Sequence, residues 1–148
     1  MRPARALGSV VLSMSAALFV VTVASVSSIQ AQVDARFAMP ERALETYIDA
    51  LRRGDVLTVT ECFNPASSFY LPGAIPIESY RVVRRSVFDS ARVKDWNSDG
   101  RPVKAREGDV ELQVHQTIAG KAEMYSYWLR LREDGWRIYS HSAWNGEL

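Results

Sequence analysis

The last third of the chain has the most regular pattern, VELQVHQTIAGKAEMYSYWLRLREDGWRIYSHSAW, which covers residues 110–144. Apolar and polar residues alternate in three runs, as they do in strands that bury one face. Two turn signals separate the runs, Ala119-Gly120-Lys121 and Asp134-Gly135, and the second is a strong hairpin signal. The stretch therefore predicts an antiparallel meander. Its apolar positions are Val110, Leu112, Val114 and Ile118, then Tyr125, Tyr127, Leu129 and Leu131, then Trp136, Ile138 and Trp144.

Two helices are predicted upstream of the meander. The first begins at Pro40 and ends before Gly54, because Pro suits a first helical turn and Gly suits the residue after the last one. Asp55 is placed to cap the second helix, and Asn64-Pro65 ends it. Apolar residues recur at steps of three and four, which predicts one buried face on each helix. These residues are Leu44, Tyr47, Ile48 and Leu51 in the first helix and Val56, Val59, Cys62 and Phe63 in the second.

The segment between the helices and the meander is less regular. We expect a short aromatic strand at residues 67–71, followed by a turn at Pro72-Gly73. Residues 80–88 fit either a strand or a helix, and their β-branched side chains favour a strand. We expect this strand to continue through residues 91–96 before a loop at residues 97–100. Two helices followed by an antiparallel sheet indicate an α+β fold in which N-terminal helices cover one face of the sheet.

Composition limits the classes of function. The chain has 148 residues, of which 47% are hydrophobic and 24% charged, as expected for one globular domain. The formal net charge of +1 gives no electrostatic argument for a nucleic-acid partner. Cys62 is the single cysteine, so the chain has neither an internal disulfide nor a multi-thiolate metal site. Its apolar neighbours indicate a buried structural residue.

The first residues have the pattern of a secretory signal peptide. Arg2 and Arg5 precede an apolar, acid-free run at residues 10–24, and small residues follow up to Ala31. We expect cleavage after Ala31, which would leave a periplasmic or secreted protein with a net charge of −1. An uncleaved anchor stays open as the alternative and would be the chain's one membrane contact, because residues 6–29 could just span a bilayer.

The remaining chain then divides into a linker at residues 32–38 and one domain at residues 39–148. The order of its elements resembles the nuclear-transport-factor-2-like superfamily, which includes ketosteroid isomerases, polyketide cyclases and scytalone dehydratase. Gly54-Asp55 lies between two amphipathic helices, and the meander closes on Asp134-Gly135-Trp136. The resemblance covers about residues 39–145. It implies a strongly curved sheet that forms a cone-shaped half-barrel around an apolar pocket, often in a homodimer, and we expect no cofactor.

The ketosteroid isomerases allow a comparison residue by residue. Tyr47 falls at the position of their oxyanion-hole tyrosine, and Tyr127 falls at the position of their second, protonated acid. Leu71 falls where those enzymes have the catalytic Asp, and leucine cannot accept a proton. We therefore expect an exported, non-catalytic domain that binds a small apolar or amphipathic ligand, or a protein partner. The expected ligand-binding residues are Tyr47, Phe69, Tyr70, Leu71, Tyr127 and Trp128.

An enzyme of the lyase or isomerase type is the alternative. Its base would be His141 or a carboxylate that folds into the pocket, such as Glu61 or Asp89. Tyr47 and Tyr127 would then donate hydrogen bonds from their hydroxyl groups to the substrate.

Two further patterns have an ordinary structural explanation beside the functional one. Asp95, Asn97 and Asp99 match the first half of a calcium loop, but Arg106 occupies the position of the bidentate Glu, and such residues are also common in turns. We expect no metal site. The cluster of Arg81, Arg84 and Arg85 fits a solvated strand edge better than a site for an anion, and His115 is expected in solvent.

Overall fold

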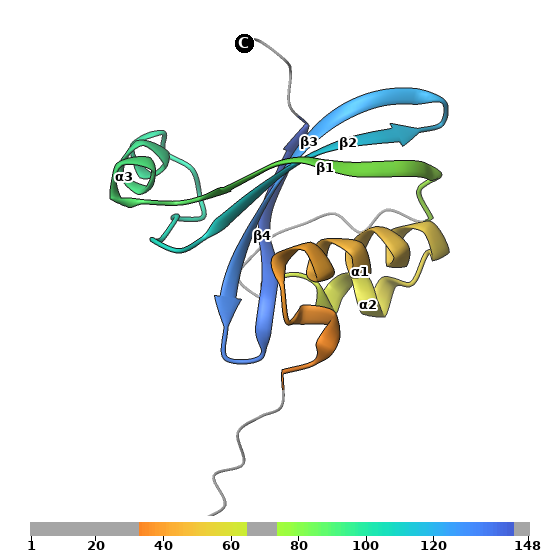
Figure 1. The fold of residues 1–148 in the computed structure, drawn as a ribbon, viewed down its shortest axis with the longest axis horizontal. Coiled ribbons are helices and arrows are strands. Elements are labelled where there is room, and N and C mark those ends of the chain that lie inside the picture. Colours follow the sequence, from red (N-terminus) through yellow and green to blue (C-terminus); the bar gives the residue numbers. More distant parts are fainter. Residues whose placement is uncertain (1–32, 65–73, 144–148) are drawn as a thin grey trace, which may run out of the picture.

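The computed structural model describes residues 33–64 and 74–143 and confirms the α+β class (Figure 1). These residues form a four-stranded antiparallel sheet in the order β1-β2-β3-β4, which does not close on itself. The elements are η1 (Ala35–Phe37), α1 (Pro40–Arg53), α2 (Val56–Glu61), β1 (Ile77–Val87), α3 (Ser90–Ser98), β2 (Val110–Ile118), β3 (Lys121–Arg132) and β4 (Gly135–Ala143).

Helices α1 and α2 form as their capping residues predict. Pro40 begins α1, and Gly54 ends it in the left-handed conformation, with φ of 66°, while its N–H bonds back to Ala50 and Leu51. The Asp55 carboxylate accepts a hydrogen bond from the Thr58 N–H at 3.1 Å and so caps α2. α2 ends at Glu61, slightly earlier than predicted.

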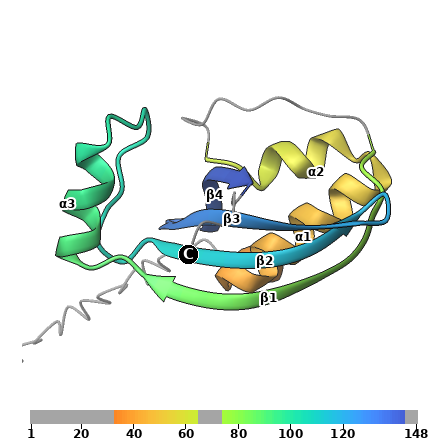
Figure 2. The same ribbon diagram turned by 90° about the horizontal axis from the view of Figure 1, so that it is seen from above.

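The main core lies between these two helices and one face of the sheet (Figure 2). The predicted meander is confirmed, and β1 settles residues 80–87 as strand. Neighbouring strands are in a register that gathers apolar side chains on the face toward α1, as in the pairs Leu112↔Tyr127 and Leu129↔Ile138. The core includes Leu44, Ile48 and Leu51 of α1, Val59 of α2, and Val110, Leu112, Val114, Tyr127, Leu129 and Ile138 of the sheet.

Helix α3 corrects the prediction of a strand at residues 91–96. The Asp89 carboxylate accepts a hydrogen bond from the Arg92 N–H at 2.9 Å, which caps a helix directly after β1. Only Val93 is β-branched within this segment, so nothing local opposes the helix. α3 lies at the far end of the sheet from α1 and α2 (Figures 1 and 2). It forms a second apolar cluster with the opposite face of the sheet, through Trp96 against Trp128.

A register shift in β4 determines which side chains face which core. Trp128 pairs with Ser140, but the next pair is Leu129↔Ile138, so Tyr139 has no residue opposite it in β3. Ile138 belongs to the main core, and Tyr139 belongs to the cluster under α3. His141 pairs with Tyr127 and so returns to the face of the main core.

The segment that we expected as a linker is partly core. Residues 35–37 form the 3-10 helix η1, capped by the Asp34 carboxylate, and the Phe37 side chain is 2% exposed. The Arg137 guanidinium lies 3.6 Å from the centre of the Phe37 ring. The folded body of the domain therefore begins before residue 39.

Cys62 is fully buried, as predicted. Burial raises the pKa of its thiol to about 12, which keeps it protonated and unreactive at neutral pH. Within residues 33–64 and 74–143, no helix is long and apolar enough to cross a membrane.

Gly135 provides a test of how tightly Phe37 is held. Its φ of 114° disfavours any side chain, and an added Cβ would lie 2.6 Å from the Phe37 carbonyl oxygen. Gly120 also has a positive φ, of 75°, but nothing lies within 4 Å of its Cβ position. We expect Gly135→Ala to lower the free energy of unfolding by more than Gly120→Ala, by about 1–3 kcal/mol for the additional clash. Urea denaturation of both variants measures the difference, and equal losses would contradict the close packing.

Candidate functional site

A pocket of about 260 Å³ lies between α1 and the sheet. Four aliphatic side chains form its apolar wall, and five side chains with polar atoms complete it. The aliphatic residues are Leu51, Ile75, Ile77 and Ile118, and the others are Tyr47, Gln116, Tyr125, Tyr127 and His141. Three residues that the sequence singled out for chemistry, Tyr47, Tyr127 and His141, are thus brought together.

Their three rings form one contiguous aromatic cluster. The Tyr47 and Tyr127 rings meet edge to face, with centroids 5.8 Å apart. The His141 ring is stacked on Tyr127 at 5.9 Å with an angle of 29° between the planes. Phe63 supports the cluster from the side at 5.3 Å from Tyr47 and 6.0 Å from His141. The rings are therefore held in fixed mutual positions by packing.

Gln116 is a pocket residue that the sequence analysis missed. Its side-chain N–H donates a hydrogen bond to the Tyr127 hydroxyl oxygen at 2.7 Å, and both residues are buried. The Tyr127 hydroxyl therefore keeps its own proton available for another acceptor. The signal was present in the sequence, because Gln116 interrupts the apolar series of residues 110, 112, 114 and 118.

The pocket is uncharged. Burial raises the pKa of both Tyr47 and Tyr127, so their hydroxyl groups stay protonated. His141 is exposed at the edge of the pocket, yet desolvation by the surrounding protein still lowers the pKa of its imidazole. The ring is therefore neutral at neutral pH. Among the described residues that line this pocket, none is Asp, Glu, Lys or Arg.

The structure places the other predicted site residues elsewhere. Trp128 lies on the opposite face of the sheet, against Trp96 of α3. Glu61 pairs with Arg36 at 3.0 Å and does not line the pocket. Asp89 caps α3. Phe69, Tyr70 and Leu71 lie outside the described residues.

The calcium-like motif has a structural role in the folded chain. Asp95 and Asn97 belong to α3 and not to a loop. The Asn97 side chain accepts a hydrogen bond from the Ala105 N–H at 2.9 Å and donates one to the Ala105 carbonyl oxygen at 3.3 Å. These two hydrogen bonds hold the segment after α3 against the helix. In the part of the chain that the structure describes, no three His, Cys, Asp or Glu side chains gather as metal ligands would.

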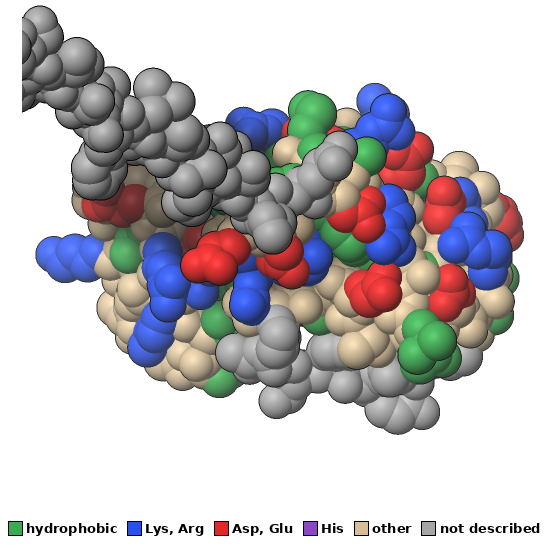
Figure 3. All heavy atoms as spheres, turned by 90° about the horizontal axis from the view of Figure 1, so that it is seen from below, with side chains coloured by type: hydrophobic (Ala, Val, Ile, Leu, Met, Phe, Trp, Pro, Cys, Tyr) green, Lys and Arg blue, Asp and Glu red, His purple; other side chains and the backbone are tan. Residues whose placement is uncertain are grey.

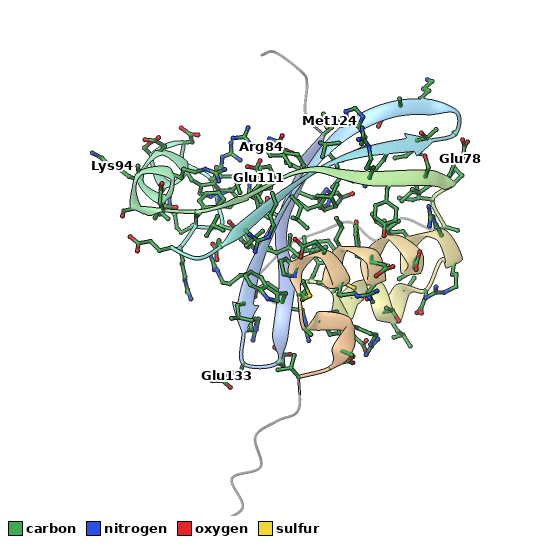
Figure 4. All side chains as sticks on the ribbon, viewed as in Figure 1. Glu78, Arg84, Lys94, Glu111, Met124 and Glu133 are labelled. Carbon is green, nitrogen blue, oxygen red and sulfur yellow. The ribbon has the colours of Figure 1, made fainter. Side chains whose placement is uncertain are left out.

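The basic cluster lies on an exposed strand edge, as predicted. β1 is an edge of the sheet, and Arg81, Arg84 and Arg85 are all exposed. Arg85 pairs with Glu41 of α1 at 3.0 Å, and Arg84 lies on the side of the sheet away from α1 and α2 (Figure 4). On the face shown in Figure 3, basic and acidic side chains alternate and leave no broad patch of one sign. His115 is exposed.

Comparison with known proteins gives no match to a family model, to a curated protein or to a solved structure. The function must therefore be argued from the residues and geometry of the chain itself.

The two pocket tyrosines should respond differently to loss of the hydroxyl group. Tyr127→Phe leaves the buried Gln116 amide without its acceptor, so we expect the free energy of unfolding to fall by about 1–3 kcal/mol. Tyr47 makes no hydrogen bond through its hydroxyl to any described residue, so Tyr47→Phe is the matched control and should cost less. Urea denaturation of the two variants and the unmodified protein measures this, and a larger loss in Tyr47→Phe would contradict the assigned network.

The buried tyrosines also predict a loss of stability in alkali. Their pKa values are raised in the folded state, whereas the unfolded phenols ionise near pH 10. The stabilisation is therefore fully present below about pH 10 and is lost as the pH rises above that value. The free energy of unfolding, measured by urea denaturation across this range, should fall less steeply in Tyr127→Phe. An unchanged slope would contradict the burial of Tyr127.

Proposed function

We propose that the chain is an exported, non-catalytic domain that binds a small, uncharged, apolar or amphipathic ligand in the pocket between α1 and the sheet. The main support for this proposal is that aliphatic side chains and neutral hydroxyl, amide and imidazole groups line the same pocket. The pattern of residues 1–31 supports export. The element order supports membership of the nuclear-transport-factor-2-like superfamily and a strongly curved, conical sheet around this pocket.

The polarity of the pocket argues for an uncharged ligand. Transferring an ion into an apolar site without a counter-charge is costly, and no described lining residue supplies one. The Tyr127 hydroxyl, already an acceptor from Gln116, can donate to a ligand oxygen. Tyr47, whose ring contacts that of Tyr127, also lines the pocket and offers a second hydroxyl. A ligand with one oxygen acceptor and an aliphatic or ring body would satisfy both parts of the site.

The pocket volume argues for a small ligand. Sites for drug-sized molecules usually enclose about 300–1,000 Å³, so 260 Å³ fits a compact molecule. This favours a small molecule over a protein segment, which would need a longer groove.

A lyase or isomerase is the second candidate, because the neutral His141 imidazole at the edge of the pocket can accept a proton. Of the three proposed bases, it alone lines the pocket in the described chain, since Glu61 and Asp89 are used elsewhere. Enzymatic turnover would then require His141, whereas simple binding would survive His141→Phe. Exposed His115 gives the matched control, His115→Phe.

Native mass spectrometry of the protein purified gently from the exported fraction tests the main proposal. A retained small-molecule mass, lost on denaturation, is the expected result and identifies the ligand. The same spectrum reports whether the chain is a homodimer. A bare protein mass, with nothing recovered in an organic extract, would count against a resident ligand.

A filled pocket should no longer bind apolar probes. Ile118 lies at the end of β2 and lines the pocket, so Ile118→Trp should occupy much of the space. We expect at least about tenfold weaker binding of the uncharged dye N-phenyl-1-naphthylamine, measured by fluorescence, since close packing leaves little room for both. The control is Leu131→Trp, at an exposed position outside this pocket. If both variants bind the dye equally well, the dye does not bind in this pocket, and the prediction is wrong.

A further inference from the structure

A second hollow of about 260 Å³ lies between α3 and the sheet face that α1 and α2 leave free. Its floor is aromatic and buried, because Phe88, Trp96 and Trp128 are 3%, 7% and 6% exposed. Trp96 meets Trp128 at 4.7 Å and Phe88 at 5.6 Å between ring centroids.

The aromatic floor already binds cations that belong to the chain. The Arg101 guanidinium carbon lies 3.8 Å from the centroid of the Trp96 ring and 5.7 Å from that of Trp128. The Arg92 guanidinium carbon lies 4.3 Å from the centroid of Phe88. The ring faces are thus presented as a surface that attracts positive charge.

The two arginines are held very differently. Arg92 pairs at 2.6 Å with Glu111, whose side chain is only 10% exposed, and Glu111 also accepts a hydrogen bond from Ser86. The Arg101 side chain is 41% exposed, and its one ion pair among the described residues is 3.9 Å long, to the exposed Asp99. An exposed pair of this length contributes little. Arg92 is therefore a fixed part of the hollow, whereas Arg101 can be displaced.

The charges around the hollow favour a cation in place of Arg101. Arg92 and Glu111 neutralise each other. Asp95 also lines the hollow and forms no ion pair with any residue that the structure describes. With Arg101 turned outward, Asp95 and Asp99 remain as two uncompensated carboxylates beside the indole rings. Figure 4 shows Glu111 on the sheet beside α3, while Lys94 points away from the sheet.

We propose that this hollow is a binding site for an organic cation of the quaternary ammonium class, for which Arg101 is a tethered substitute. The ligand's ammonium group lies over Trp96 and Trp128 after Arg101 turns outward, and Asp95 and Asp99 supply the counter-charge. A quaternary ammonium fits this floor because it donates no hydrogen bonds and loses little hydration on contact with ring faces. The site is independent of the uncharged pocket, which lies on the other face of the sheet.

The test is a titration of the whole purified protein with choline chloride, at constant ionic strength, followed by the indole N–H resonances. The expected result is a saturable shift of the Trp96 and Trp128 signals, with Trp136 as the internal reference. The neutral isostere 3,3-dimethylbutan-1-ol should produce no such shift, because it has the same shape without the charge. A response to both compounds would mean a merely apolar hollow and would overturn the proposal.

Two variants make the proposal sharper. Arg101→Ala removes the tethered competitor, so choline should bind about two- to fivefold more tightly, the range that an exposed cation–ring contact accounts for. Asp95→Asn removes a counter-charge and should weaken binding, and both positions are exposed enough for the fold to be kept. Arg106→Ala and Glu133→Gln, at exposed positions outside the hollow, are the matched controls. Weaker binding in Arg101→Ala, or no saturable shift in either protein, would overturn the assignment.

Discussion

The register shift at Tyr139 is the constraint on which both faces of the sheet depend. In a regular strand, side chains alternate, so residues three apart point to opposite faces. Ile138 and His141 are three apart, yet one belongs to the main core and the other lines the pocket on that same face. The extra residue in β4 allows Ile138 and His141 to face the same side of the sheet, and it turns Tyr139 toward α3. Because of this one inserted residue, β4 places the Tyr139 ring beside α3 and the His141 ring at the pocket on the other face.

Much of the fold follows from local signals in the sequence. Proline, glycine and the Asp55 cap delimit the first two helices, and the alternation of residues 110–138 specifies the meander. Helix α3 was missed because its one decisive signal, the Asp89 cap, follows directly after a strand. Trp128 was misplaced for a simpler reason: it is the neighbour of Tyr127 in a strand, so the two side chains must point to opposite faces. Register shifts depend on tertiary packing and leave no such mark.

The sheet separates two chemically different environments. Neutral side chains line the pocket between α1 and the sheet, whereas charged and aromatic side chains line the hollow beside α3. A buried ion pair attaches the segment between α3 and β2 to the sheet. In this pair, Arg130 of β3 donates hydrogen bonds to both carboxylate oxygens of Asp109, at 2.9 and 2.7 Å. The same guanidinium donates to the Lys104 carbonyl oxygen at 2.7 Å. Because such a pair is costly to break, the return from α3 into β2 is held in place independently of the main core.

The position of Phe37 limits how far anything attached to the N-terminus can lie from the folded domain. The backbone and Cβ of Phe37 lie against Gly135, where β3 turns into β4. Ala31 precedes Phe37 by six residues, which span at most about 20 Å when extended. Anything attached upstream, whether a leader, an anchor or an affinity tag, is thus kept near that hairpin. His141 lies six residues further along β4, also about 20 Å away. A domain tethered to a surface at that point would therefore keep the uncharged pocket within about 40 Å of the point of attachment.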